Sequence, residues 1–389
     1  MIKRIVLLNT WHNSFDDRVF YHQAKSLLEH GFKVIIISTK DDCIQEVDQI
    51  CINSFNDFNL PRTDKNNEII NRLTDFSPDI IICDSPSAIF VSVKYQKSHN
   101  VRIIYDITEW YPSKIHLQYN KGIQKSLRFI VLILFNLIAG FKSDSFIFGE
   151  YYKSLIFRML YFWKQHIKLP YYPDTNYIQY YPVEKITSEI NLLYSGKINK
   201  DKGIDAVIES IKLAGINCPE IQFKLKIIGN FPTENDISFF NNLIADIPHN
   251  VHISITKSLP FPEFCKTIGN THLFFDLRKI DFENTHCLPI KLFYYLACGR
   301  PVIYSNLKSI RKEIVNINFG KLFEPNDYLS IATFIEKCIV NKEFYDLQCK
   351  NALDASVNKY NWEIIQKRFF DFIESNLVIV TCQLHTKHE

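Results

Sequence analysis

The sequence predicts an α/β protein with two doubly wound domains, each built on a parallel sheet that helices cover on both faces. Short β-branched runs alternate with stretches of helical periodicity along the chain, which is typical of such sheets. A length of 389 residues favours two domains, because a single hydrophobic core stops growing well below that size. The proline- and tyrosine-rich stretch 169–182 separates two strand–helix series. We therefore place the first domain at 1–170, a linker at 171–182 and the second domain at 183–361.

Each strand is predicted from a short apolar run that turn residues bound. In the first domain these runs are 4–8, 33–38, 79–84, 101–105 and 145–148. In the second domain they are 191–194, 224–228, 251–255, 272–275 and 302–304. Residues 19–30 have apolar side chains at helical spacing and stop at Gly31, which predicts the first crossover helix. Residues 362–377 predict an amphipathic helix, which either docks on the second domain or crosses back onto the first.

The composition argues against several classes of protein. A formal net charge of +3 gives no reason to expect nucleic acid as a partner. The chain has no Gly-x-x-x-x-Gly-Lys segment of a P-loop NTPase. Its ten cysteines form no Cys-x-x-Cys pair, and the N-terminus has no signal-peptide pattern. We therefore expect reduced thiols, no zinc site and a cytoplasmic location.

The segment 289–305 predicts a short helix followed by a buried strand. Pro289 suits the first helical position, because its absent N–H would have no partner there. Gly299 can take the left-handed conformation that ends a helix. The free N–H groups and positive dipole end of such a helix suit a phosphate group. An ordinary αβ unit would have the same pattern, but it would leave Lys291 unexplained.

This segment resembles the donor-site signature of retaining glycosyltransferases of family 4, of the type that builds bacterial surface polysaccharides. The signature reads roughly Pro-x-Lys-x-Phe-Glu-Tyr-x-Ala-x-Gly-x-Pro-Val-Ile. The matching positions are Pro289, Lys291, Phe293, Tyr295, Ala297, Gly299, Pro301, Val302 and Ile303. The resemblance implies the GT-B fold, in which two Rossmann-like domains face a cleft. Two positions depart from it: Tyr294 replaces the usual glutamate, and His286 stands where the family's other carboxylate often lies.

The loop Ser195-Gly-Lys-Ile-Asn-Lys-Asp-Lys-Gly203 follows the first strand of the second domain. It resembles the family's Gly-Arg-x-x-x-x-Lys-Gly segment, with Lys197 in the arginine position and Lys202 before the final glycine. Two cations at a strand-to-helix turn can hold a diphosphate and stabilise its charge as it leaves. The alternative is a solvated basic loop.

The resemblance implies two sets of site residues in the second domain. The catalytic set is Lys197, Lys202, Glu283 and His286. The donor-binding set is Gly196, Gly229, Arg278, Asn284, Thr285, Leu288, Pro289, Ile290, Lys291 and Tyr294. Glu283 or Asp281 can supply the carboxylate that position 286 lacks. Arg278 can either meet the phosphates or pair with Asp276 or Asp281.

Three segments of the first domain, 13–19, 105–112 and 148–152, resemble the family's acceptor side. The acceptor-side residues that this implies are Asp17, Arg18, Asp106, Glu109, Trp110 and Glu150. Asp16 and Asp17 also suit the N-cap and first turn of the next helix, and we favour that role. The family's histidine position is occupied by Thr108.

Residues 129–141 are apolar apart from Asn136 and Gly140. The flanking basic residues are Lys121, Lys125, Arg128 and Lys142. Thirteen residues are too few to span a bilayer, which needs about 20. Such a helix can lie in the headgroup layer of an anionic membrane, or it can be a core helix. The first alternative predicts that 121–142 binds the cytoplasmic face of the inner membrane.

The resemblance as a whole implies an enzyme that transfers a sugar from a nucleotide diphosphate sugar to a glycan or a lipid-linked glycan, with retention. We expect no metal and no cofactor, since lysines would stabilise the leaving diphosphate and no Asp-x-Asp triplet occurs. One alternative is a nucleotide-sugar 2-epimerase of the same fold. The other is a catalytically silent GT-B subunit that binds glycan or a partner, which Tyr294, His286 and Thr108 support.

Overall fold

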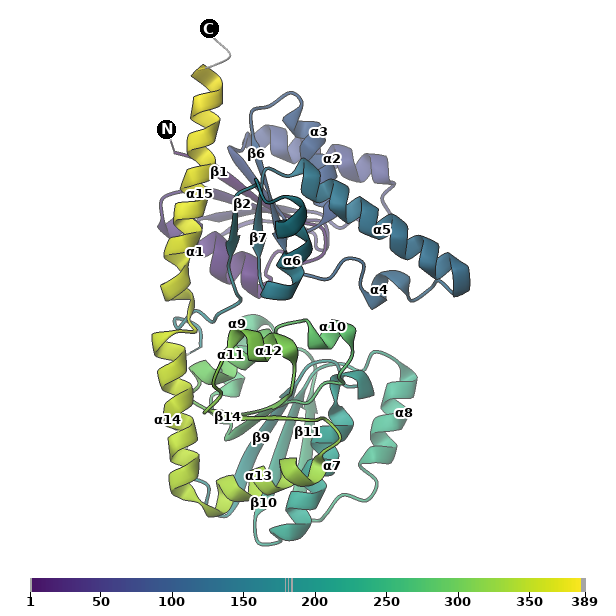
Figure 1. The fold of residues 1–389 in the computed structure, drawn as a ribbon, viewed down its shortest axis with the longest axis vertical. Helices are drawn as coiled ribbons and strands as arrows, with labels where there is room; N and C mark the ends of the chain where they lie inside the picture. The colour runs from purple at the N-terminus through teal and green to yellow at the C-terminus, as the bar shows by residue number, and fades with distance from the viewer. Residues whose placement is uncertain (1, 179, 181, 183–184, 386–389) are drawn as a thin grey trace. The chain divides into compact units, whose positions relative to one another are not determined.

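In the computed structural model the chain divides into two units (Figure 1). Unit 1 comprises residues 1–171 and 365–389, and unit 2 comprises residues 172–364. The structure describes residues 2–178, 180, 182 and 185–385. Each unit is an α/β fold around one sheet, so the predicted fold class is confirmed. The predicted linker includes residues 179 and 181, which lie outside the described residues.

The sheet of unit 1 has the strand order β3-β4-β2-β1-β5-β6-β7-β8. Its strands are β1 (Arg4–Asn9), β2 (Lys33–Ser38), β3 (Cys43–Val47), β4 (Ile50–Ser54), β5 (Ile80–Cys83), β6 (Arg102–Ile107), β7 (Ser145–Phe148) and β8 (His166–Lys168). The β3–β4 pair is antiparallel and the other pairs are parallel. Every residue of β5 is buried, as expected for a parallel strand with helices on both faces. The five strands predicted for this domain are present, and β3, β4 and β8 are additional.

The helices of unit 1 follow the strands in alternation. They are the π-helix η1 (Asp17–Ala24), α1 (Lys25–Glu29), α2 (Arg62–Phe76), α3 (Pro86–Gln96), α4 (Lys114–Leu117), α5 (Gly122–Lys142) and α6 (Tyr151–Leu160). The predicted crossover helix is thus η1 continued by α1, and Gly31 follows it with a φ of 89°. Helix α3 packs against both α2 and α5. These three helices cover one face of the sheet (Figure 1).

Helix α15 (Trp362–His385) is longer than the predicted 362–377, and from Ile365 onward it belongs to unit 1. Ser145 at the start of β7 donates a hydrogen bond to Asn376 Oδ1 over 2.8 Å. His30 lies 2.9 Å from Glu374 and stacks on the ring of Phe370. The last long helix therefore packs on the first sheet unit rather than on the unit that precedes it in sequence.

The sheet of unit 2 is entirely parallel, in the order β11-β10-β9-β12-β13-β14. Its strands are β9 (Glu189–Ser195), β10 (Gln222–Ile228), β11 (Val251–Thr256), β12 (Leu273–Asp276), β13 (Val302–Ser305) and β14 (Gly320–Phe323). Its helices are the 3₁₀ turn η2 (Lys200–Lys202), α7 (Ile204–Asn217), α8 (Glu234–Leu243), α9 (Phe261–Ile268), α10 (Phe282–Thr285), α11 (Ile290–Ala297), α12 (Lys308–Glu313), α13 (Tyr328–Val340) and α14 (Lys342–Asn358). The five predicted strands are present, and β14 is additional.

The segment 289–305 forms a helix and a strand, as predicted, with one correction. Helix α11 begins at Ile290, and Pro289 is its N-cap with φ −71° and ψ 117°, not its first helical residue. The extended ψ at Pro289 lets the chain enter the helix directly from the preceding loop. Gly299 has a φ of 66° and ends the helix, as predicted.

The predicted segment 121–142 is helix α5, which begins seven residues before the apolar run 129–141. It has 21 residues, and an 18-residue window has a mean hydropathy of 1.6 with 17% of that window buried. Within the described part of the chain it is the one helix that length and composition would allow to cross a membrane. The low burial argues against the alternative of an ordinary core helix.

Candidate active site

In unit 2 the end of β9 and the start of α11 are joined by a lysine. Lys291 Nζ donates to the carbonyl oxygen of Ser195 over 2.9 Å and to its Oγ over 2.7 Å. A Cβ built on Gly196 would lie 4.0 Å from the same Nζ. The predicted donor-binding positions 196 and 291 are therefore neighbours at the carboxyl end of the sheet, where ligands of open α/β folds bind.

A second lysine joins the loop after β9 to the loop after β12. Lys202 Nζ donates to Asn284 Oδ1 over 3.0 Å. Asn284 Nδ2 in turn donates to Lys279 O over 3.0 Å, and Asp281 caps helix α10 by accepting from the backbone N–H of Asn284 over 2.9 Å. The structure thus brings together Lys202, which was predicted to act in catalysis, and Asn284, which was predicted to bind the donor.

The charges around Lys202 are mostly positive. Burial lowers the pKa of Lys202, and the positive charges of Arg278 and Lys197 lower it further, while Asp276 raises it. Asp276 accepts two hydrogen bonds from the guanidinium of Arg278, one of them 2.6 Å long from Nε. Asp276 is therefore paired with Arg278, whereas Lys202 donates to the neutral amide of Asn284 rather than to a carboxylate.

Lys197 is the exposed member of this group. Its ammonium makes no hydrogen bond or ion pair with any residue that the structure describes, although its backbone carbonyl accepts from Tyr194 Oη over 2.7 Å. The tyrosine also donates to the carbonyl of Lys202 over 3.2 Å. The loop backbone is therefore fixed by Tyr194, while the ammonium of Lys197 remains available to an anion.

Two glycines allow the loops of this site to pack closely. A Cβ on Gly229 would lie 1.8 Å from the carbonyl oxygen of Gly196, and a Cβ on Gly203 would lie 1.7 Å from that of Leu277. Gly203 also has a φ of 77°, which disfavours any side chain. The structure therefore gives Gly229 a packing role, in addition to the donor-binding role that the resemblance implies.

The remaining predicted residues of unit 2 lie around α10 and α11. Thr285, Leu288 and Pro289 are buried, and Glu283, His286 and Ile290 are partly exposed. His286 Nδ1 lies 2.8 Å from the carbonyl oxygen of Phe282. Tyr294 is only 3% exposed, with its ring centroid 5.8 Å from that of Phe261 in α9. The position where the family has glutamate is therefore inside an aromatic cluster.

In unit 1 the structure joins two of the predicted acceptor-side residues to each other. Arg18 Nε and Nη2 donate to the two carboxylate oxygens of Asp106 over 2.9 and 2.8 Å, and both residues are buried. Gln23 Nε2 donates to the same carboxylate over 2.7 Å. Arg18 also donates to Leu169 O over 3.0 Å and lies 4.1 Å from the ring centroid of Tyr171. Three hydrogen bonds of Arg18 and both carboxylate oxygens of Asp106 are thus used within unit 1.

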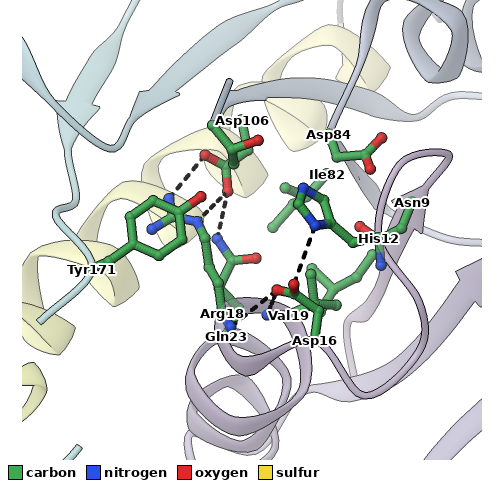
Figure 2. Close-up of a pocket in the computed structure, with 12 residues that line it drawn as sticks. Asn9, His12, Asp16, Arg18, Val19, Gln23, Ile82, Asp84, Asp106 and Tyr171 are labelled. Atoms are coloured by element: carbon green, nitrogen blue, oxygen red, sulfur yellow. Dashed lines mark hydrogen bonds and ion pairs between the residues drawn. The ribbon is translucent and has the colours of Figure 1, made fainter. Parts of the chain in front are cut away.

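The Arg18–Asp106 pair lines a small polar cavity at the ends of β1, β5 and β6 (Figure 2). Its volume is about 10 Å³, which is the space of about one water molecule. The lining residues are Leu7, Asn9, His12, Asp16, Arg18, Val19, Gln23, Ile82, Asp84, Asp106, Thr108 and Tyr171. Asn9 Nδ2 and Thr108 Oγ1 are buried without a hydrogen-bond partner among the described residues. A buried polar atom without a partner is costly, so the cavity suits a polar ligand atom or water.

His12, which sequence analysis missed, lies in this cavity beside two carboxylates. Its Nδ1 is 3.1 Å from Asp16 Oδ2, and Asp16 is also the N-cap of η1. Asp84 accepts from the backbone N–H groups of Thr10 and Trp11 over 2.9 to 3.0 Å, which holds the loop that carries His12. A signal was present in the sequence, since His12 follows the predicted strand 4–8 and Asp84 is the last residue of the predicted strand 79–84.

Two of the other acceptor-side residues, Glu109 and Glu150, lie beside Lys153. Lys153 Nζ lies 2.6 Å from Glu150 Oε1 and 3.9 Å from Glu109 Oε2, and it donates to the carbonyl oxygen of Thr108. Glu109 is exposed, Glu150 is buried, and Trp110 is partly buried. Asp17 lies in the first turn of η1, and its neighbour Asp16 is the cap, in line with the favoured role. Within the ranges that the structure describes, no three His, Cys, Asp or Glu side chains are grouped to hold a metal ion.

The His12–Asp16 pair predicts a pH-dependent contribution to stability. Burial alone would lower the pKa of His12, but the hydrogen bond and charge of Asp16, with Asp84 and Glu109, raise it to about 9. With an unfolded-state pKa near 6.5, the contribution is fully present below about pH 6.5 and is lost as the pH rises through about 9. Its size is at most about 3 kcal/mol. Urea unfolding at pH 6, 8 and 10 measures the free energy of unfolding. As the pH rises from 6 to 10, this free energy should fall less in His12→Gln than in the wild type, and parallel pH profiles of the two proteins would refute the prediction.

Solved structures define the class of fold to which this chain belongs. Sucrose-phosphate synthase from Thermosynechococcus elongatus superimposes with a TM-score of 0.71 at 14% identity, over 97% of this chain and 100% of that one. Anabaena HepE in complex with UDP-glucose gives 0.68 at 12% identity, over 96% and 99%. Identities this low establish the fold alone, and that fold is the two-domain GT-B fold of glycosyltransferases.

A family model matches most of the second unit. Residues 182–354 match the model described as "Glycosyl transferases group 1", which confirms the predicted resemblance to glycosyltransferases. The capsular polysaccharide biosynthesis glycosyltransferase CapM of Staphylococcus aureus is 27% identical over 188 residues. These residues are 47% of this chain and 46% of that protein, so the match spans less than half the length of the relative.

Proposed function

We propose that this protein is a glycosyltransferase that moves a sugar from a nucleotide diphosphate sugar to a glycan or a lipid-linked glycan. The observation that carries the proposal is the excess of positive charge at the carboxyl end of the sheet in unit 2. The positive charges of Arg278 and Lys197 both act on Lys202, and Asp276 already balances the charge of Arg278. A diphosphate would supply the missing negative charge, and the N–H groups at the start of α11 would add donors to it.

In the proposed reaction the bond between the anomeric carbon and the diphosphate oxygen breaks, and a bond from the acceptor hydroxyl to that carbon forms on the same face. Negative charge develops on the leaving diphosphate, and the acceptor hydroxyl gives its proton to an oxygen of that diphosphate. Lys202 and Lys197 would stabilise that charge, which is the step at which positioned cations accelerate transfer most. We propose that the protein needs no metal for this step, because the lysines perform the role that a metal would have.

The relatives support the choice of substrates. The HepE structures contain UDP, UDP with glucose, or UDP-glucose, and CapM is described as a capsular polysaccharide enzyme. We therefore propose a UDP-sugar as the first donor to test and a polysaccharide precursor as the acceptor. We also propose that the reaction takes place in the cytoplasm.

One observation favours a second candidate, a silent subunit that binds a nucleotide or a glycan without transfer. Tyr294 stands where the resembled family has glutamate, and it is buried against Phe261 rather than open to a ligand. Thr108 stands where the family has histidine, and a threonine hydroxyl is a much weaker base. Binding without turnover would support this candidate.

The first experiment is calorimetry of the protein with UDP, GDP and their common sugar conjugates, without added metal. We expect one nucleotide to bind, and Lys202→Ala to weaken that binding at least about tenfold, because one charge-assisted contact contributes about 1.5–3 kcal/mol. Lys224→Gln is the matched control, since this lysine pairs with Glu189 on an exposed part of unit 2.

The products distinguish the candidates. Transfer to an added acceptor supports the proposed function, and release of an altered free sugar from the donor alone would identify an epimerase. Nucleotide binding with neither product favours the silent subunit. Absence of binding by every nucleotide would contradict the proposed donor site.

A further inference from the structure

Helix α5 presents an apolar stripe to solvent on the side opposite its buried residues. Its buried residues are Leu132, Asn136, Ala139 and Gly140. The exposed stripe, spaced by three or four residues, is Ile123, Leu127, Ile130, Leu134, Ile138 and Phe141. With 3.6 residues per turn, this spacing places the stripe along one face of the helix. Residues 121–131 are all exposed, and this end of α5 extends past the sheet of unit 1 (Figure 1).

The second half of α5 is tied firmly to unit 1. Asn136 accepts from Tyr105 Oη over 2.8 Å and donates to Tyr111 O over 3.1 Å. Near the end of the helix, Tyr161 Oη donates to Leu137 O over 2.6 Å, and Lys164 Nζ donates to Gly140 O over 2.9 Å. A helix held by one side in this way is not free to enter a bilayer lengthwise, although its length would allow that. Only its exposed stripe is open to a partner.

The charge around the stripe is entirely positive. Residues 110–143 contain five lysine and arginine residues and no aspartate or glutamate. Three of these cations, Lys121, Lys125 and Arg128, lie in the fully exposed half of α5. By their spacing they lie on the side of the helix away from the apolar stripe. Basic residues on one face and large apolar residues on the other are typical of a helix that lies in the surface of an anionic membrane.

A second exposed apolar segment adjoins the end of α5. Met159, Phe162 and Trp163 are 76%, 77% and 58% exposed, at and just after the end of α6. The turn that carries them is fixed to α5 by Tyr161 and Lys164, whose bonds are described above. Tryptophan prefers the interface between lipid and water, so Trp163 suits the same surface.

We propose that α5 and residues 159–163 form a lipid-binding face that lies flat on a bilayer containing anionic lipid. Both segments belong to unit 1, and the face neither includes the donor residues of unit 2 nor requires turnover. The inference therefore goes beyond the proposed function, and vesicle binding without transfer would leave it intact.

The test is co-sedimentation of the full chain with vesicles of phosphatidylcholine alone or with 30% phosphatidylglycerol. We expect binding to the anionic vesicles, and at least about a tenfold weaker partition for Ile123→Ser/Leu127→Ser, since burial of each side chain drives the insertion. Ile44→Ser/Phe58→Ser is the matched control, because these residues are equally exposed elsewhere in unit 1, and it should bind as the wild type does. Lys121→Gln/Lys125→Gln/Arg128→Gln should weaken anionic binding about 100-fold, at about 1 kcal/mol per basic residue.

Three further results decide how α5 and residues 159–163 lie on the membrane, and whether lipid or a second copy of the chain covers the apolar stripe. Quenching of fluorescence by brominated lipid that disappears in Trp163→Phe would support contact of the second segment with lipid. Retention on vesicles after alkaline carbonate washing would show a spanning helix and overturn the flat arrangement. Failure to bind vesicles, together with a dimer that Ile123→Ser/Leu127→Ser dissociates in sedimentation equilibrium, would overturn the proposal and assign the stripe to a second copy of the chain.

Discussion

Replacing Lys202 by alanine is expected to lower the rate of sugar transfer about 100- to 1000-fold, as removal of one charge-stabilising donor does in other enzymes. In the proposed reaction Lys202 meets the developing charge of the diphosphate. The substitution should cost little stability. Burial lowers the pKa of Lys202, so the folded state disfavours its charge, and the structural loss is the bond to Asn284, worth about 1 kcal/mol. Initial rates and thermal unfolding of the same preparation measure the two effects.

Two variants make this result specific. Lys202→Arg keeps the charge but changes its geometry, and it should retain more activity than the alanine variant. Lys200→Ala removes an exposed lysine from the same loop and should transfer sugar at the wild-type rate. Turnover of Lys202→Ala at the wild-type rate would remove Lys202 from the mechanism.

The strands that could be predicted from sequence are those whose surroundings require apolar residues. Strand β5 is buried throughout and reads as four consecutive apolar residues. Strand β3 pairs only with β4 at the edge of the sheet, and its central residues are exposed. Polar residues such as Gln45 and Glu46 are tolerated there, so the strand has no apolar run from which it could be predicted. Strand β8 has only three residues, which gives periodicity too little length to detect.

The candidate site was predictable where its residues follow one another in the chain. Lys197 and Lys202 stand in a single loop directly after a strand, so their position at the edge of the sheet follows from the strand itself. The contact between Lys202 and Asn284 joins residues 82 positions apart and depends on the order β9-β12 in the sheet. His12 and Asp84 meet for the same reason, through the parallel pairing of β1 with β5.

The predicted segment 121–142 matches α5, but the apolar run within it does not show where the helix starts. The first half of α5 is polar and apolar in alternation, with Lys125, Ser126 and Arg128 between large apolar residues. A search for an unbroken apolar run therefore starts at position 129. The helix nevertheless begins at Gly122, because basic residues are tolerated at its solvent-exposed end and do not terminate it.

Removal of Arg18 is expected to destabilise unit 1 by about 3–5 kcal/mol, because it leaves the Asp106 carboxylate buried with Gln23 as its remaining donor. Burial would lower the pKa of Arg18, but the charge of Asp106 and its hydrogen bonds raise it, so the guanidinium stays charged beside the carboxylate. Arg18→Met keeps the length of the side chain, and urea unfolding followed by hydrogen exchange in unit 1 measures the loss.

The double variant Arg18→Met/Asp106→Leu separates a structural pair from an acceptor site. If the pair is structural, the double variant should be more stable than Arg18→Met, since no unpaired charge stays buried, and the coupling between the two changes should be at least about 1 kcal/mol. If Arg18 instead orients the acceptor, Arg18→Met would remain folded and raise the KM for acceptor with little change for donor. Arg18 already makes three hydrogen bonds within unit 1 and lies over the ring of Tyr171, which leaves its guanidinium little capacity for an acceptor. We therefore expect the large stability loss, in which case Arg18 and Asp106 form a structural pair and other residues recognise the acceptor.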